Sequence, residues 1–171
     1  MLVVMTGLPG TGKSAIAEAV AQVLPAPVFS VDPLEAALLR SGITREQNSG
    51  IAAYELAAEL ARSQLRLGQS AVVDAVNAWE SLRRWYLGMA EPVGAPAVLI
   101  ETICSDRALH REQFEHRRRA IEGWIYEPTW RDVELRMLEY EPSSLDRLVL
   151  DAVEPLEENR RAAVEYVTAR R

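Results

Sequence analysis

Eight residues near the amino terminus decide the fold: Gly7-Leu8-Pro9-Gly10-Thr11-Gly12-Lys13-Ser14. They match the pattern G-x-x-x-x-G-K-[ST] of a phosphate-binding loop. An apolar run of strand length, residues 2–6, precedes the loop, and a segment with apolar residues at helical spacing, residues 15–24, follows it. This order of strand, glycine-rich loop and helix distinguishes a phosphate-binding loop from a glycine- and proline-containing turn before an ordinary helix.

The residue types in the loop fit the phosphates of a nucleotide. Its three glycines let the backbone bend around a polyphosphate, and its N–H groups point at negative charge. Lys13, which is the only lysine among 19 basic residues, can reach the β- and γ-phosphates, and the hydroxyl of Ser14 suits Mg²⁺. We therefore predict ATP and Mg²⁺ as cofactors. The predicted nucleotide-binding residues of the loop are Gly7, Leu8, Pro9, Gly10, Thr11, Gly12, Lys13 and Ser14.

Length and charge limit the classes of protein that this chain can belong to. Its 171 residues are most simply one domain, residues 1–171. The net charge of −6 disfavours nucleic acid as a partner. Cys104 is the only cysteine, and no apolar segment approaches the length of a membrane span or a secretory signal. We therefore expect a cytoplasmic protein that does not bind membranes.

Apolar runs of strand length alternate with helical patterns along the chain. The runs lie at residues 2–6, 28–31, 70–75, 97–104 and 148–152. They are continuously apolar, which is typical of parallel strands buried on both faces. The pattern predicts a three-layer α/β/α fold with a central parallel sheet of about five strands. In such sheets ligands bind beyond the carboxyl ends of the strands.

Acidic residues follow two of these strands. Asp32 can accept the proton of an acceptor hydroxyl, or it can cap a helix that we expect to begin at Pro33. Asp74 can hold Mg²⁺ or hydrogen-bond the glycine loop. Asn77, just beyond, can contact the acceptor or shape the loop. A further helix is expected to follow a cap at Thr44 and to run to position 67.

Arginines gather in a segment that we predict to be a helical lid, residues 107–131. Arg107, Arg111 and Arg118 are spaced by four and seven residues, so they would share one helix face. Arginines folded over the γ-phosphate stabilise its charge during transfer; alternatively, they pair with glutamates of the same helix. We predict that Arg111 and Arg118 are catalytic and that Arg117 binds the nucleotide.

The chain resembles the P-loop kinases that have an AAA-type ATP-binding domain, a group that includes polynucleotide 5′-hydroxyl kinases, zeta toxins and chloramphenicol phosphotransferase. The resemblance rests on the glycine loop, Asp32 and the strand end Val72-Val73-Asp74-Ala75-Val76-Asn77. It implies a kinase reaction in which Asp32 faces the acceptor hydroxyl under an arginine lid. Polynucleotide kinases usually have an arginine three residues after this aspartate, but this chain has Glu35, which would repel a nucleic-acid phosphate.

The leading hypothesis is an ATP- and Mg²⁺-dependent kinase that acts on a hydroxyl of a small molecule, such as a nucleoside, a sugar or an antibiotic. Lys13, Asp32, Arg111 and Arg118 are its expected catalytic residues, and Ser14 and Asp74 its metal ligands. Asp32, Glu35 and Asn77 are expected at the acceptor. The alternatives are a polynucleotide 5′-hydroxyl kinase and an ATPase switch that changes the conformation of a partner protein.

Overall fold

Five parallel strands form the centre of the computed structural model, in the order β2-β3-β1-β4-β5. The strands are β1 (Leu2–Gly7), β2 (Val28–Ser30), β3 (Ala71–Asp74), β4 (Ala97–Ile103) and β5 (Leu148–Asp151). The structure describes residues 1–117, 121–122, 124 and 127–171. The central strand β1 is buried along its whole length, and Leu2 lies opposite Ala71 of β3 and Ala97 of β4. The predicted parallel sheet is thus confirmed.

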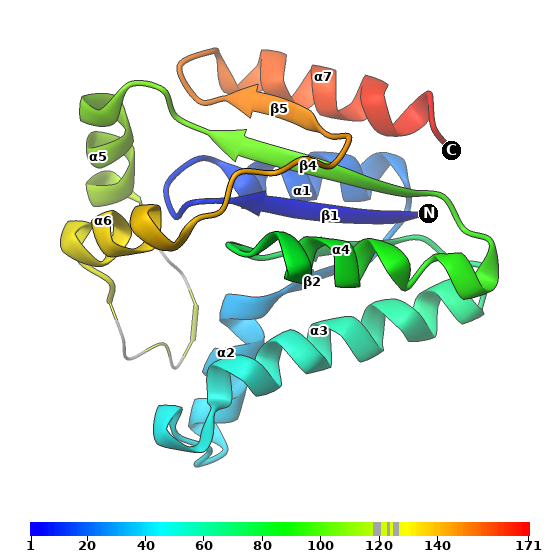
Figure 1. The fold of residues 1–171 in the computed structure, drawn as a ribbon, viewed down its shortest axis with the longest axis horizontal. Coiled ribbons are helices and arrows are strands. Elements are labelled where there is room, and N and C mark those ends of the chain that lie inside the picture. Colours follow the sequence, from blue (N-terminus) through cyan, green and yellow to red (C-terminus); the bar gives the residue numbers. More distant parts are fainter. Residues whose placement is uncertain (118–120, 123, 125–126) are drawn as a thin grey trace.

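Helices cover both faces of the sheet (Figure 1). α1 (Lys13–Val23) and α7 (Leu156–Thr168) pack on one face, while α3 (Ser49–Arg66) and α4 (Glu80–Gly88) pack on the other. Side chains from successive positions of each strand point to opposite faces, so each face of the sheet buries its own apolar cluster. This burial on both sides accounts for the continuously apolar strands and confirms the three-layer architecture.

The remaining helices lie around the carboxyl ends of the strands. α2 (Val31–Arg40) follows β2 directly, and α5 (Arg107–His116) and α6 (Trp130–Glu139) stand beyond the ends of the central strands (Figure 1). Two short 3₁₀ helices, η1 (Arg45–Gln47) and η2 (Glu91–Val93), complete the described elements. Among the described residues, no helix is long and apolar enough to cross a membrane.

The start of α2 differs from the prediction. The helix begins at Val31 with Ser30 as its N-cap residue, so Asp32 lies inside the first turn and is not the cap. Pro33 is tolerated there because the first N–H groups of a helix have no partner within it. Asp32 is therefore the second residue of α2 and does not occupy the predicted N-cap position.

The helix predicted to follow Thr44 is interrupted. Thr44 and Gln47 form a reciprocal capping box around η1. Asn48 then adopts a left-handed conformation, with φ of 63°, and α3 begins only at Ser49. A left-handed residue cannot continue a right-handed helix, so the single predicted helix becomes two elements.

A connecting segment, residues 140–147, fixes the ends of the two central strands. The hydroxyl of Tyr140 lies 2.7 Å from Oγ1 of Thr6 and donates to Oε1 of Glu101 at 2.9 Å. Glu101 is buried and also forms an ion pair with Arg147. A buried carboxylate needs such partners to offset the loss of water, so this network holds the end of β1 in the position from which the glycine loop begins.

The buried phenols predict how stability depends on alkaline pH. Burial raises the pKa values of Tyr54 and Tyr140 to about 12 from the usual value of 10.0. Between these values the unfolded chain loses the phenolic protons that the folded chain keeps, so the free energy of unfolding should fall as pH rises from 10 towards 12. Urea unfolding between pH 8 and pH 11.5 measures this fall.

The variant Tyr140→Phe tests the assignment. It should be less stable at pH 8 by about 1–2 kcal/mol, because Glu101 loses a hydrogen bond. Its stability should decline less steeply above pH 10 than that of the wild type. Identical alkaline slopes for the two proteins would show that Tyr140 does not contribute.

Candidate active site

The glycine loop joins β1 to α1 and is packed tightly against β4. Gly7 has φ of 136°, and a Cβ at this position would lie 2.2 Å from the carbonyl oxygen of Thr102. Only glycine fits such a position, because the backbone of β4 cannot move away without breaking its pairing with β1. The sequence of the loop is therefore imposed by packing as well as by phosphate binding.

Helix α5 supports the loop from the other side. Nε2 of His110 lies 2.8 Å from the carbonyl oxygen of Pro9, and because a carbonyl only accepts, His110 carries its proton on Nε2. A Cβ on Gly10 would lie 3.0 Å from Cβ of Phe114. Trp130 of α6 packs edge-on against His110, with ring centroids 5.1 Å apart. Burial lowers the pKa of His110, which favours the neutral ring.

The ends of β2 and β3 and the start of α1 meet at the carboxylate of Asp74. Its Oδ2 accepts hydrogen bonds from the hydroxyls of Ser14 and Ser30, each at 2.8 Å. The carboxylate thus does bond to the glycine loop, as one of its two predicted roles required. The same arrangement places a hydroxyl and a carboxylate oxygen side by side, the hard oxygen donors that Mg²⁺ prefers.

The donor set therefore fits the Mg²⁺ that this loop motif implies. The described part of the chain contains no group of three or more histidine, cysteine, aspartate or glutamate side chains placed to hold a metal ion. Mg²⁺ beside a nucleotide does not need one, because waters and phosphate oxygens supply most of its ligands. Ser14 and Asp74 are the protein oxygens that would hold it.

A cleft of about 1250 Å³ opens beyond these strand ends. Its lining includes the glycine loop, the first turns of α2 and α3, the segment that follows β3, and parts of the lid. Lys13 lies in this lining, with its Nζ donating to the carbonyl oxygen of Leu8 at 2.9 Å. Asp32 lines the same cleft, so an acid and the phosphate-binding lysine face one space.

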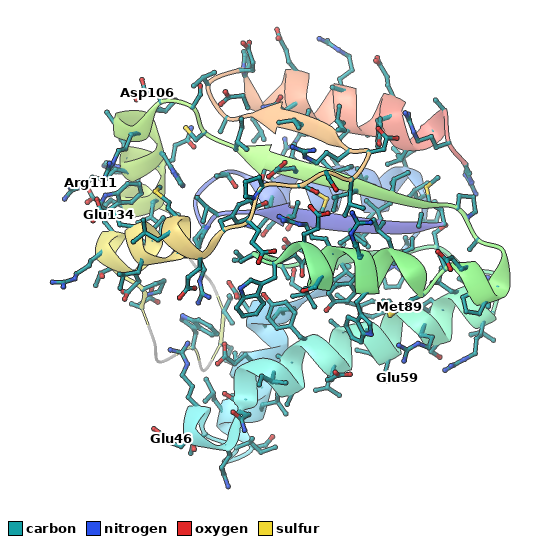
Figure 2. The ribbon with its side chains drawn as sticks, in the orientation of Figure 1. Glu46, Glu59, Met89, Asp106, Arg111 and Glu134 are labelled. Atoms are coloured by element: carbon teal, nitrogen blue, oxygen red, sulfur yellow. The ribbon has the colours of Figure 1, made fainter. Side chains whose placement is uncertain are left out.

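The lid arginines do not all face this cleft. Arg117 lines it, with its guanidinium 3.9 Å from the ring centroid of Phe114. Arg111 does not: it is exposed, and its Nε donates to Glu115 at 2.7 Å. Figure 2 shows Arg111 at the outer edge of α5, beside Glu134 of α6. In this structure Arg111 is thus not directed into the cleft, and its catalytic role stays a prediction; Arg118 lies outside the described residues.

Glu35 lines the cleft but is not the bare acid that the sequence suggested. It is buried, and its Oε1 accepts from Nε of Arg45 and from Oγ of Ser49, each at 3.1 Å. Arg45 also lines the cleft, with its guanidinium 5.8 Å from the ring centroid of Trp124. The arginine compensates the charge of Glu35, so the argument that this acid repels an acceptor phosphate is weakened.

Asn77 shapes the loop after β3 and does not line the cleft. It is fully buried with φ of 47°, and its Nδ2 donates to the carbonyl oxygen of Met5 at 2.7 Å. Of its two predicted roles, only the one that shapes the loop agrees with this placement.

Sequence reasoning also missed several residues of the site. Arg45 of η1, Arg136 of α6, and Trp79 and Trp85 at α4 line the cleft from three different segments. Nothing local distinguishes them from surface residues of helices. For His110 the sequence does contain a signal. His110 lies four residues before Phe114, and Arg117 lies three residues after Phe114, so the three side chains share one face of α5. The apolar character of that face predicts that these residues turn towards the loop.

The metal site predicts a Mg²⁺-dependent effect of Asp74→Asn. The change removes charge but keeps an oxygen near Ser14, so affinity for ATP measured by calorimetry should fall about tenfold, or about 1.4 kcal/mol, in the presence of Mg²⁺. With the metal chelated, affinity should change little. The control variant Asp146→Asn, exposed and outside the cleft, should match the wild type. An equal loss with and without Mg²⁺ would mean that Asp74 acts only by holding the loop.

Comparison with known proteins agrees with this geometry. The profile of the AAA domain family (AAA_33) matches residues 2–124. No curated protein sequence matches the chain significantly.

Solved structures match over nearly the whole chain. A gluconokinase from Sinorhizobium meliloti has a TM-score of 0.71 at 19% sequence identity, covering 98% of this chain and 91% of its own. The APS kinase CysC of Mycobacterium tuberculosis, in complex with AMPPNP and APS, has 0.65 at 18%, covering 98% and 96%. Kti12 of Chaetomium thermophilum, in complex with ADP-AlF3, has 0.73 at 17%, covering 99% and 98%. At these identities the likeness is one of fold, and the fold is that of P-loop kinase-like proteins.

Proposed function

Because the chain belongs to the AAA domain family, we propose that it is an ATP- and Mg²⁺-dependent kinase that phosphorylates a hydroxyl of a small molecule. One observation carries the proposal: Asp32 and Lys13 line the same cleft. A phosphate-binding loop alone serves switches and motors as well as kinases. An acid across from the loop is what a hydroxyl acceptor requires, because it can receive the proton of that hydroxyl.

The proposed reaction is an in-line transfer. The acceptor oxygen forms a bond to the γ-phosphorus as the bond to the β,γ-bridging oxygen breaks, ADP leaves, and the hydroxyl proton passes to Asp32. Lys13 and the N–H groups of the loop bind the phosphates. Mg²⁺ held by Ser14 and Asp74 would neutralise developing charge on the phosphate oxygens.

Asp32 suits its proposed role by position. It lies in the first turn of α2, in the lining of the cleft. Ser30 occupies the N-cap position of this helix, and its hydroxyl donates to Asp74. A carboxylate held there can orient an acceptor hydroxyl before it accepts the proton.

Arg117 is the lid arginine that we assign to the transferring phosphoryl group. It lines the cleft, and its guanidinium lies over Phe114, which also packs against Gly10 of the loop. The charge of Arg117 is thus held over a side chain, Phe114, that lies against the loop. Arg118 remains a prediction from the sequence.

A polynucleotide 5′-hydroxyl acceptor is the second candidate. The ion pair between Arg45 and Glu35 supports it, because it compensates the acid that would otherwise face a nucleic-acid phosphate. The net charge of −6 argues against it. Transfer of labelled phosphate from ATP to an oligonucleotide with a 5′-hydroxyl distinguishes this candidate from a small-molecule kinase.

The proposed base predicts a separation of binding from transfer in Asp32→Ala. ATP affinity should stay within about twofold, whereas the rate of phosphate transfer should fall by about a hundredfold or more, which is typical for loss of a general base. The measurement is transfer of labelled γ-phosphate to the best acceptor found among nucleosides, sugars and antibiotics. The control variant Glu46→Ala, exposed on η1 and outside the cleft, should behave as wild type.

Two results would contradict this assignment. Transfer by Asp32→Ala within about tenfold of wild type, or about 1.4 kcal/mol of barrier, would mean that the residue has only a structural role. ATP hydrolysis that a protein partner stimulates, with no phosphorylated small product, would favour a switch over a kinase.

A further inference from the structure

Large apolar side chains are exposed in one part of the cleft. Trp79 is 49% exposed, Trp85 is 37% exposed and Ile51 is 65% exposed, and all three line the cleft. Apolar surface left in water costs about 25 cal/mol per Å². Exposed apolar groups gathered in a concave site mark a place where a ligand binds. We call Trp79, Trp85 and Ile51 the aromatic wall.

The aromatic wall lies close to the proposed chemistry. Trp79 is the N-cap residue of α4 and follows the metal-site residue Asp74 by only five positions. On α3, Ile51 is three residues before Tyr54, which also lines the cleft. Burial is the main cause that raises the pKa of Tyr54, and the nearby charges of Asp32 and Glu35 raise it further. Tyr54 and Asp32 line the same cleft as the wall.

The cleft has room for a second ligand beside a nucleotide. Its volume of about 1250 Å³ exceeds the roughly 300–1,000 Å³ that is usual for a site that holds one small molecule. The glycine loop, Lys13 and Ser14 account for the phosphates. The aromatic wall is separate from these phosphate-binding residues. It is formed by residues of α3 and α4, on the β3 side of the loop.

The charges around the wall indicate what kind of ligand it accepts. Among the described residues that line the cleft, six are acidic (Glu18, Asp32, Glu35, Glu55, Asp74 and Asp132) and four are basic (Lys13, Arg45, Arg117 and Arg136). Two of these arginines are engaged in ion pairs, Arg45 with Glu35 at 3.1 Å and Arg136 with Glu139 at 2.9 Å. The described lining thus has more acidic than basic side chains, which disfavours an anionic ligand beside the phosphates of ATP.

We propose that the aromatic wall binds the acceptor, and that the acceptor is a ring-bearing alcohol without negative charge. Tryptophan faces pack against flat or ring-shaped apolar surfaces, and they attract cationic groups, which the nearby carboxylates would also favour. The ring lies against Trp79 and Trp85 while its hydroxyl reaches Asp32. This inference rests on the proposed kinase function, because the wall is assigned to the acceptor of that reaction.

Matched pairs of alcohols test the charge of the acceptor. The probes are adenosine with adenosine 3′-monophosphate and phenyl β-D-glucoside with phenyl β-D-glucuronide. Binding to the protein loaded with AMPPNP and Mg²⁺ is measured by calorimetry, and transfer from ATP is measured with labelled γ-phosphate. We expect at least one uncharged ring compound to bind and react at least tenfold better than its acidic counterpart.

Substitutions test the wall itself. Trp79→Ala and Trp85→Ala should each raise the KM for that acceptor at least tenfold and leave the KM for ATP within twofold, which also shows that the variants are folded. Trp79→Phe and Trp85→Phe should restore most of the affinity. Leu138→Ala is the control, because Leu138 is 85% exposed on α6 and does not line the cleft. Glu55→Arg should narrow the preference for adenosine over its 3′-monophosphate.

Failure of the inference can be told apart from failure of the kinase proposal. Preferential phosphorylation of an acidic probe would contradict the proposal that the aromatic wall binds an acceptor without negative charge. A KM for the acceptor that is unchanged in both alanine variants would contradict it too. Both results would leave the kinase proposal standing. If ring compounds bind through the tryptophans but are not phosphorylated, the kinase proposal is contradicted and the proposed binding surface stands. If no ring compound binds, the proposal that the aromatic wall binds the acceptor is wrong.

Discussion

The carboxylate of Asp74 joins the ends of β2 and β3 to the start of α1. It accepts hydrogen bonds from Ser14, at the start of α1, and from Ser30, at the end of β2. Parallel pairing brings the ends of β1, β2 and β3 to one edge of the sheet, and the two hydrogen bonds link the end of the glycine loop to the ends of β2 and β3. The glycine loop, the proposed metal ligands and the helix that carries Asp32 are thereby held together, and the proposed phosphate transfer requires such positioning.

Helices α5 and α6 of the predicted lid are anchored on the glycine loop. Phe114, Trp130 and Val133 form a small apolar cluster separate from the two main cores, and it rests on the loop through the contact of Phe114 with Gly10 and the bond of His110 to Pro9. Because this cluster is small, it contributes less burial than the main cores and can shift at lower cost. A lid anchored in this way stays in register with the phosphates that it is proposed to cover.

The sequence predicts the fold because the relevant signals are local. The glycine loop with its flanking strand and helix lies within residues 2–24, and continuously apolar strands already imply helices on both faces. The start of α2 was harder to predict. Asp32 and Pro33 fit the N-cap and first helical positions as well as they fit the first turn, and only the structure places Ser30 at the N-cap position. For Arg111, spacing gave the shared face but not the direction in which that face turns. That direction is set by contacts of His110 and Phe114 with the loop.

The acceptor side was not predictable because it is assembled from distant segments. Tertiary packing alone brings together the residues that line this side of the cleft, which are Arg45, Trp79, Trp85 and Arg136. Each of them alone resembles a surface residue.

The central claim is that this cleft transfers the γ-phosphoryl group of ATP to an alcohol. Phosphorus NMR of the protein turning over ATP and Mg²⁺ with a bound alcohol tests it most directly. The account predicts a new phosphomonoester signal that grows as ADP forms; ADP accompanied only by inorganic phosphate, with every alcohol tested, would contradict it.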